Sequence, residues 1–221
     1  MVPRAVKAAY YFLLSPAMRL NAASHRVAPR LGNTAPVRVH LGPGQRNYLP
    51  GWVNVDANLV SSRPDIWADL RFALPFRNDS VDCFYSHHVI EHLPDLDAHF
   101  RELFRCLKPG GLMRVGGPHG DNAMIAMQQG RAAWFGDWPT KRTSMGGRFE
   151  NFIFCKGEHL TILTQSFLTE LATNAGFTDV RTLAPGETTN PTLFTPDALA
   201  LEPESDPSLP HTLLIEARKP G

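Results

Sequence analysis

Residues 36–44, with the sequence Pro-Val-Arg-Val-His-Leu-Gly-Pro-Gly, join a short apolar run to a glycine turn. Such a run, bounded by glycine and proline, is typical of a buried strand. Residues 52–55 form a second short strand pattern that ends at Asp56, and residues 81–85 form a third. Glycine at the end of a parallel strand lets a ligand approach the backbone. These segments therefore predict an α/β domain with a ligand site at one edge of its sheet.

The segments that follow alternate between helix and strand patterns. Asp95 is a natural N-cap for a helix that extends through Leu107, and the Lys-Pro-Gly-Gly sequence at 108–111 ends it. The apolar stripe of this helix consists of Leu96, Phe100, Leu103, Phe104 and Leu107. Further segments indicate a strand at 112–115, a helix at about 166–175, and strands at 177–183 and 212–217.

No clear helical pattern separates the last two strands, so we expect them to pair antiparallel at one edge of the sheet. The sequence thus predicts a doubly wound, Rossmann-like, mostly parallel sheet with an antiparallel edge strand. We expect residues 1–35 to form an N-terminal helical extension and residues 36–221 to form the main domain. Within this domain, residues 116–160 are expected to form a lid and residues 184–211 a proline-rich connection with a short helix from Thr195.

Composition narrows the class of protein. With 221 residues, 43% of them apolar, the chain suits one domain with a sizeable core. Lys and Arg total 22 against 21 Asp and Glu, and the net charge of +1 gives no electrostatic footprint for nucleic acid. The three cysteines are scattered and form no CxxC pair, so neither a disulfide framework nor a zinc ribbon is indicated. A reducing cytoplasm is the expected location.

The N-terminal segment has a basic start and a short apolar run that is interrupted by Pro16 and Arg19. No stretch reaches the ~20 apolar residues that a transmembrane helix needs. A packed N-terminal helix is favoured over an export signal or a membrane-surface segment. Peripheral contact of this helix with a membrane stays open.

Acidic residues accompany the glycine turn. Asp56 closes the second strand and could accept hydrogen bonds from a ribose diol, and Asp69 with Leu70 could present a carboxylate and an apolar wall to an adenine ring. Each aspartate alone could be an ordinary turn residue. Together with Gly42 and Gly44, in the order that the fold demands, they predict a nucleoside cofactor.

Five ordered motifs carry a resemblance to a known family. They are VRVHLGPG (37–44), LPGWVNVDAN (49–58), ADLRFALPF (68–76), SVDCFYSHHVIEHL (80–93) and LFRCLKPGGLMRV (103–115). They resemble class I S-adenosylmethionine-dependent methyltransferases, and in particular the type 11 methyltransferase-domain group, including members associated with bacterial surface polysaccharide and small-molecule pathways. The resemblance is close over about residues 36–116 and looser through 164–180 to the last strand.

The resemblance implies roles at the matching positions. Gly42 and Gly44 would face the methionine part of S-adenosylmethionine, Asp56 its ribose hydroxyls, and Asp69 with Leu70 its adenine. This sequence departs from the family in the short segment between the first two strands, which leaves room for only a very short helix.

Further along the chain, the resemblance places Ser86 and His87 beside the sulfonium. A second departure is Pro43, which stands where relatives often have Cys or another small residue. Proline removes one N–H donor from the turn but leaves both glycines intact.

Histidines are the candidate bases for methyl transfer to a poor nucleophile such as a hydroxyl. His88 and His119 both follow strands that end at the predicted site, and His159 could hang from the lid. His88, Glu91 and His92 have helical spacing, but without a clear third ligand we expect no metal site. Glu91 and His92 are expected to anchor the turn, and any single histidine is more often structural than catalytic.

The expected function is methyl transfer by in-line displacement to a small-molecule or glycan acceptor, at an oxygen atom, with no nucleic-acid partner. The aromatic and basic residues of 130–156 could bind an acidic or glycan acceptor, or they could pack the lid. One alternative is a cofactor-binding, methyltransferase-like scaffold without turnover. Another is a nicotinamide-dependent oxidoreductase, although Asn47 replaces the third glycine of that motif. The sequence leaves the acceptor and the oligomeric state open.

Overall fold

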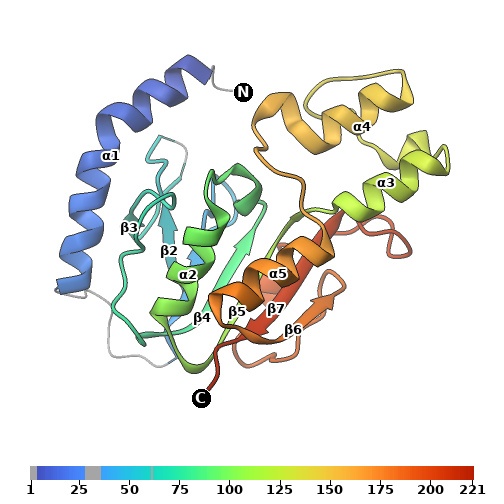
Figure 1. Cartoon of the computed structure of the whole chain (residues 1–221). Coiled ribbons are helices and arrows are strands. Elements are labelled where there is room, and N and C mark those ends of the chain that lie inside the picture. The colour runs from blue at the N-terminus through green and yellow to red at the C-terminus, as the bar shows by residue number, and fades with distance from the viewer. Residues whose placement is uncertain (1–3, 28–35, 61) are drawn as a thin grey trace.

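The computed structural model describes residues 4–27, 36–60 and 62–221. Its centre is a seven-stranded sheet with the order β3-β2-β1-β4-β5-β7-β6 (Figure 1). Five strands run parallel: β1 (Arg38–Leu41), β2 (Val53–Asp56), β3 (Ile66–Trp67), β4 (Val81–His87) and β5 (Leu107–Pro118). Strand β7 (Thr212–Arg218) pairs antiparallel with both β5 and the edge strand β6 (Thr178–Leu183). The predicted mostly parallel α/β sheet with an antiparallel edge is confirmed.

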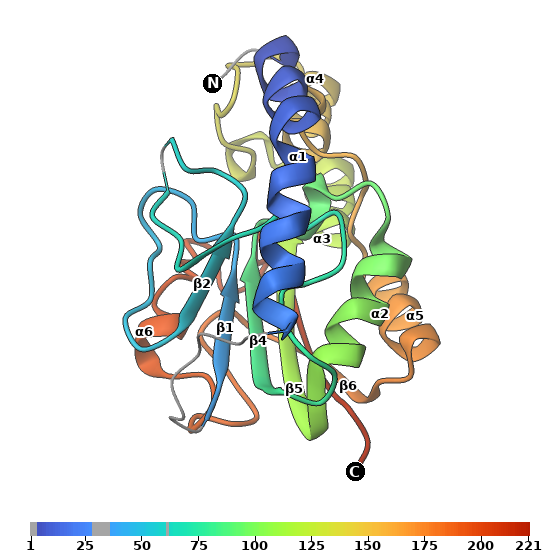
Figure 2. The same ribbon diagram turned by 90° about the vertical axis from the view of Figure 1, so that its left-hand side faces the viewer.

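One face of the sheet carries the main core and the long helices α1 (Arg4–Val27), α2 (Leu96–Cys106) and α5 (Gln165–Ala175) (Figure 2). Helix α2 begins as expected, since the Asp95 carboxylate accepts a hydrogen bond from the Ala98 N–H at 2.8 Å. Of the predicted stripe, Phe100 and Leu103 are fully buried with Val39 and Leu41 of β1. Leu107, expected at the end of this helix, instead begins β5.

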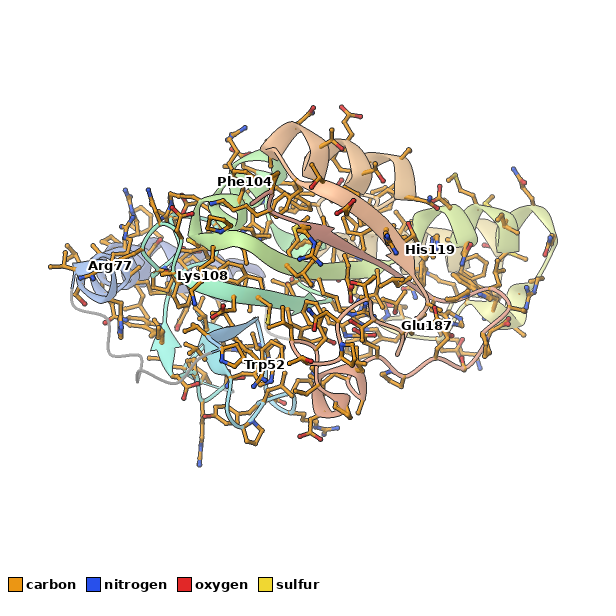
Figure 3. All side chains as sticks on the ribbon, turned by 90° about the horizontal axis from the view of Figure 1, so that it is seen from below. Trp52, Arg77, Phe104, Lys108, His119 and Glu187 are labelled. Carbon is orange, nitrogen blue, oxygen red and sulfur yellow. The ribbon has the colours of Figure 1, made fainter. Side chains whose placement is uncertain are left out.

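The opposite face is covered by loops and by the one-turn helix α6 (Pro196–Leu199). Trp52 and Phe104 label the two sides of the sheet (Figure 3). Between β1 and β2 the chain makes a turn at 44–46 and no helix. The described residues place no long helix on this face, and His40 and Tyr85 are covered by the segments around Trp52 and Phe194.

The proline-rich connection 184–211 is held on this second face by buried charges. Arg114 of β5 bonds Glu202 of the connection and Glu216 of β7, and all three side chains are at most 1% exposed. The hydroxyl of Thr188 and the backbone N–H of Thr189 also donate to Glu216, at 2.7 and 2.9 Å. This long connection is therefore a fixed part of the fold.

Residues 119–160 of the predicted lid extend beyond the carboxyl ends of the parallel strands (Figure 1), whereas its first residues, 116–118, belong to β5. They include α3 (Gly120–Gln128), η2 (Ala132–Trp134), α4 (Met145–Phe154) and η3 (Cys155–Gly157). Four lid aromatics pack on one another: Trp134, Phe135, Phe149 and Phe152. The sequence left open whether these aromatics bind an acceptor or pack the lid, and the structure shows that these four pack. Trp138, by contrast, is 71% exposed.

Helix α1 buries one stripe of side chains and exposes apolar side chains on its other face. Its inner stripe is Ser15, Met18, Ala22 and His25, which are all buried. Its outer face exposes larger apolar side chains at between 55% and 82%: Val6, Phe12, Leu13, Leu20 and Val27. No helix in the described part of the chain is long and apolar enough to cross a membrane. The domain division at residue 35 stays a prediction, because residues 1–3 and 28–35 lie outside the described residues.

Candidate functional site

The glycine turn after β1 lies against the end of β2. Gly42 and Gly44 have φ values of 70° and 57°, in the left-handed region that favours glycine. At Gly42 a Cβ atom would lie 2.4 Å from Cγ2 of Val89, so this position tolerates no side chain. The Gly44 N–H donates to Oδ2 of Asp56 at 3.0 Å, and the Asn58 N–H donates to Oδ1 at 2.9 Å.

These two bonds orient the Asp56 carboxylate without exhausting it. An ionised carboxylate has about four acceptor positions, and in the described chain the recorded bonds to Asp56 use two of them. The side chain is half-buried at the carboxyl end of β2. Asp56 can therefore still accept hydrogen bonds from a pair of hydroxyl groups.

Asp69 lies beyond β3 and is fully engaged. Arg71 bonds it through Nε at 2.9 Å, Nη2 at 2.7 Å and its backbone N–H at 3.1 Å. The Ser15 hydroxyl donates to Oδ2 at 2.7 Å. Burial raises the pKa of Asp69, but the hydrogen bonds from Arg71 and Ser15 outweigh it and hold that pKa below its usual value. An adenine ring could bond Asp69 only by replacing one of these partners. The neighbouring Leu70 is buried in the main core.

Helix α1 lies beside this end of the sheet, a position that the sequence pattern does not predict. The Tyr10 hydroxyl donates to the Ala57 carbonyl at 2.6 Å, and Trp67 Nε1 donates to the same oxygen at 2.9 Å. Lys7 forms an ion pair with Glu158 at the end of the lid. Helix α1 thus borders the predicted cofactor site. Polar residues within a largely apolar helix were the available signal.

Ser86 and His87 end the central strand β4. Within the described residues, neither the Ser86 hydroxyl nor Nε2 of His87 has a hydrogen-bond partner, although both atoms are buried. Burial, then the nearby charges of His88 and Arg114, lower the pKa of His87 to about 3. His87 is therefore neutral at pH 7. Buried polar atoms without partners are uncommon, and at a strand end they fit a polar ligand.

His88 follows in a left-handed conformation with φ of 56°. Its Nδ1 lies 3.2 Å from Oε1 of the buried Glu91, and its Nε2 lies 3.3 Å from the Thr212 hydroxyl. A carboxylate only accepts hydrogen bonds, so Nδ1 carries the proton when His88 is neutral. The lone pair of that tautomer is then on Nε2, where it accepts from the Thr212 hydroxyl.

His119 is the N-cap of α3. Its Nδ1 accepts the Asn122 N–H at 3.3 Å, which places the proton of the neutral ring on Nε2. Burial lowers the pKa of His119, with Asp121 opposing this effect. In this tautomer Nε2 is a donor and a backbone N–H occupies Nδ1, whereas the lone pair of His88 faces the Thr212 hydroxyl, which an acceptor hydroxyl could replace. The geometry therefore favours His88 over His119 as a base.

Comparison with known proteins places this site in context. Residues 55–115 match the methyltransferase domain family model. No curated protein matches the sequence. The chain shares its fold with a SAM-dependent methyltransferase of Archaeoglobus fulgidus, at 15% identity and a TM-score of 0.54, covering 95% of this chain and 100% of that one.

Two further solved structures show the same fold. One is from a Haloferax volcanii complex with a methyltransferase activator, at 18% identity and a TM-score of 0.52 over 100% of both chains. The other is a SAM-dependent methyltransferase of Thermotoga maritima, at 18% identity and a TM-score of 0.51 over 97% of this chain and 96% of that one. The predicted relationship is confirmed: the chain has the class I S-adenosylmethionine-dependent methyltransferase fold, and its residues 55–115 match the methyltransferase domain family.

Proposed function

We propose that this protein transfers a methyl group from S-adenosylmethionine to a hydroxyl oxygen of a small-molecule or glycan acceptor. The observation that supports it best is the row of groups along three adjacent strand ends. Among the described residues, Asp56 at β2 retains free acceptor positions, and Ser86 with His87 leaves buried polar atoms without partners at β4. The glycine turn lies between them at β1.

These residues fit the cofactor. Asp56 would hold the ribose hydroxyls, and the space beside Gly44, where a Cβ atom would meet nothing within 4 Å, admits a ligand close to the backbone. Ser86 and His87 would border the sulfonium end with neutral polar groups. When bound, S-adenosylmethionine supplies an activated methyl group and its own leaving group. The role of Asp69 would be indirect, through Ser15 and Arg71.

His88 supports an oxygen acceptor. A hydroxyl loses its proton during methyl transfer, and Nε2 of His88 can take that proton once the acceptor hydroxyl replaces the Thr212 hydroxyl there. Glu91 holds the ring from behind, at Nδ1. The remaining task of the chain is to align the acceptor and to exclude water. An amine or thiolate acceptor would need no such base.

The exposed part of the lid supports an acidic or glycan acceptor. Lys141 and Arg142 have side chains that are 75% and 48% exposed, and each lies at the distance limit of an ion pair, 4.0 Å from Asp137 and 3.9 Å from Glu150. Trp138 lies near them in sequence with its ring in solvent. Arg148 instead donates to the carbonyls of Ala132 and Phe135, so it stabilises the lid. Stacking on Trp138 and charge from Lys141 and Arg142 would suit a sugar that carries a carboxylate or phosphate.

Calorimetric titration with S-adenosylmethionine and with NADH tests the cofactor. We expect binding of S-adenosylmethionine alone, whereas binding of NADH alone would reject the proposal in favour of an oxidoreductase. Incubation with methyl-labelled S-adenosylmethionine and bacterial extract then tests transfer. Labelled ethers that survive mild base indicate hydroxyl acceptors. Cofactor binding without any labelled product would favour the scaffold alternative.

A second proposal concerns α1 and a membrane surface. Val6, Leu13, Leu20 and Val27 recur at every seventh residue and are all at least 55% exposed. The basic residues of this helix have no acidic counterpart between positions 4 and 27. An exposed apolar stripe on a positively charged helix suits the interface of an anionic membrane. Peripheral contact would bring the site close to a lipid-linked acceptor.

A further inference from the structure

Among the described residues, the buried carboxylate of Glu91 has no ion-pair partner with a fixed positive charge. It belongs to η1 (Ile90–His92), directly after β4, and its side chain is 1% exposed. Its recorded ion-pair contacts in the described chain are with His88 at 3.2 Å and His92 at 3.9 Å, neither of which has a fixed charge. Its Oε2 atom has no hydrogen-bond partner among the described residues. A buried carboxylate is costly unless a cation compensates it.

Gly117 of β5 leaves the space for this carboxylate. A Cβ atom at position 117 would lie 2.7 Å from Oε2 of Glu91, so any larger residue would displace the carboxylate. The site is thus formed by the carboxyl ends of β4 and β5, next to His88.

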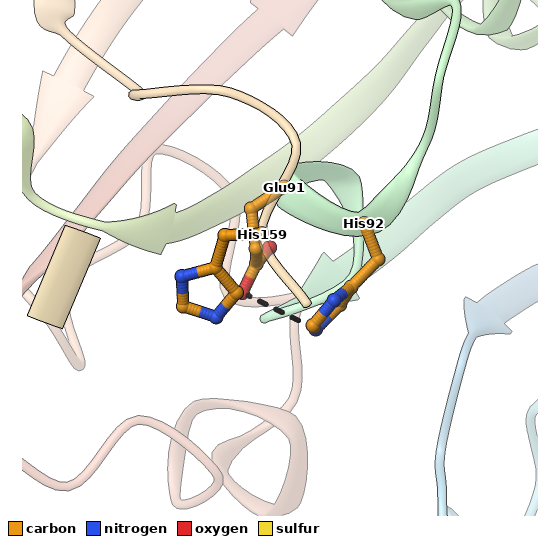
Figure 4. A group of neighbouring side chains, drawn as sticks. All are labelled: Glu91, His92 and His159. Carbon is orange, nitrogen blue, oxygen red and sulfur yellow. Dashed lines mark ion pairs between the residues drawn. The ribbon is translucent and has the colours of Figure 1, made fainter. Parts of the chain in front are cut away.

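Two histidines approach Glu91 from different parts of the chain (Figure 4). His92 follows it directly, and His159 comes from the end of the lid. One ligand atom from each of Glu91, His92 and His159 can be chosen so that all three lie within 4.8 Å of one another. The two imidazole rings meet edge to face, with centroids 5.0 Å apart.

The backbone orients both rings in the way that metal ligands require. Nδ1 of His92 lies 2.9 Å from the Glu158 carbonyl, and Nδ1 of His159 lies 2.9 Å from the Ile153 carbonyl. A carbonyl only accepts hydrogen bonds, so each neutral ring carries its proton on Nδ1 and has its lone pair on Nε2. A hydrogen bond from the other ring nitrogen to a carbonyl is the usual second-shell contact of metal-bound histidine.

The two segments are also joined to each other. The Leu160 N–H donates to the Glu91 carbonyl at 2.7 Å, which fixes His159 beside Glu91. The bond from His92 to the Glu158 carbonyl is a second link. The lid therefore returns to the sheet at this cluster.

We propose that Glu91, His92 and His159 form a binding site for one divalent transition-metal ion. Two imidazoles and one carboxylate suit Zn²⁺ and its first-row neighbours better than Mg²⁺ or Ca²⁺, which prefer oxygen ligands throughout. Three protein ligands leave a coordination position open, as in catalytic zinc sites. Ligand atoms about 2.0–2.1 Å from a tetrahedral ion lie about 3.3 Å apart, so binding draws these side chains together. The His92 side chain is 41% exposed and has room to move.

The sequence predicts no metal site, because it offers no clear third ligand beside His88 and His92, and the site proposed here differs from that expectation. His159 lies far from them in sequence, and only the return of the lid makes it the third ligand. His88 contacts Glu91 from the other side and would orient it. Resting on the proposed function, we infer that the ion's open position takes an oxygen atom of the acceptor.

Metal binding is tested on the untagged full-length protein after dialysis against a chelator. Zn²⁺ is titrated by calorimetry, and Co²⁺ is added separately to record its d–d absorption. We expect one ion per chain and the intense visible bands of a four- or five-coordinate Co²⁺ site. Second-shell changes alone cost about 10–100-fold in metal affinity, so Glu91→Gln and His159→Gln should each weaken Zn²⁺ binding at least ~100-fold. His119→Gln, which removes a histidine outside the cluster, should not.

Circular dichroism on each variant identifies any that fail to fold, and His92→Gln then replaces such a variant. Absence of stoichiometric binding, or binding that survives all three changes in folded protein, overturns the site. The same preparations are titrated with S-adenosylmethionine. Metal binding without cofactor binding upholds the site and rejects the proposed function. If transfer activity is found, its full survival after chelation overturns the acceptor role of the ion.

Discussion

Arg114 in β5 and Glu202 in the proline-rich connection form a fully buried ion pair with two hydrogen bonds, at 2.7 and 2.6 Å. The guanidinium fork matches the carboxylate, and Glu216 takes a third N–H at 2.9 Å. Breaking a buried pair leaves an uncompensated charge, at a cost of about 3–5 kcal/mol. This pair therefore determines where the connection lies.

The first prediction concerns this pair. Glu202→Gln should lower the free energy of unfolding by about 3 kcal/mol, because Arg114 keeps only Glu216 as a charged partner. The measurement is the urea midpoint at pH 7. Glu187→Gln changes an exposed glutamate of the same connection and should stay within about 0.5 kcal/mol. Equal midpoints for the two variants would contradict the assignment.

The second prediction concerns Asp56. Hydrogen bonds to charged groups contribute about 1.5–3 kcal/mol each, so Asp56→Ala should weaken S-adenosylmethionine binding at least ~10-fold. Calorimetry measures the affinity and circular dichroism the fold. Asp97→Ala, at an exposed position in the first turn of α2, is the matched control. Unchanged affinity in the Asp56 variant would remove this residue from the site.

The third prediction concerns the base. Positioned general bases contribute about 10²–10⁴-fold, so His88→Gln should lower kcat by that order while leaving cofactor affinity nearly unchanged. His119→Gln should have a much smaller effect, because the Nδ1 of His119 already serves as the helix cap. The measurement is kcat against pH on the identified acceptor. A wild-type profile for His88→Gln would mean that alignment alone carries the reaction.

The fourth prediction is a loss of stability in acid. Burial lowers the pKa of His99 to about 4, with the Leu70 carbonyl opposing it, against an ordinary value of 6.5. Above pH 6.5 neither state binds the proton. As the pH falls from 6.5 to 4, His99 binds a proton in the unfolded chain but not in the folded chain. The free energy of unfolding therefore decreases over this pH range. At pH 5 the loss from His99 is about 2 kcal/mol.

The matched variant is His99→Gln, which keeps a donor for Leu70 and does not titrate. The urea midpoint should fall less between pH 7 and pH 5 in this variant than in the wild type. His40 and His87 have lowered pKa values in both proteins and cancel in the comparison. Equal pH slopes would show that the site of His99 admits the charged ring.

The fifth prediction concerns α1. The protein should co-sediment with phosphatidylglycerol vesicles more than with phosphatidylcholine vesicles, and high salt should weaken the binding. Replacing both Leu13 and Leu20 of the exposed stripe by Ser should reduce it by about tenfold. Val60→Ser, at an apolar side chain that is 87% exposed outside α1, is the control. Vesicle binding that these substitutions leave unchanged would place the membrane contact outside α1 or reject it.

Local patterns were sufficient to predict the sheet and its principal helices. The glycine turn, the Asp95 cap and the apolar stripe of α2 each act over a few residues, so their meaning can be read without the rest of the chain. The positions of Gly42, Gly44, Asp56, Ser86 and His87 at one edge follow from the same logic, because parallel strands end together. Their roles toward the cofactor remain proposals.

Contacts between distant segments could not be read in this way. Asp69 is a good cofactor ligand by its position in the sequence, yet Ser15 and Arg71 occupy its acceptor positions. The sequence does not distinguish His119 from His88, and only the structure shows that His119 caps a helix while His88 contacts Glu91. His159 joins Glu91 only through the fold of the lid. The sequence alone determined the sheet and the edge at which a ligand would bind. Burial and hydrogen bonding depend on the packed chain, so only the tertiary structure decided which side chains at that edge are free to react.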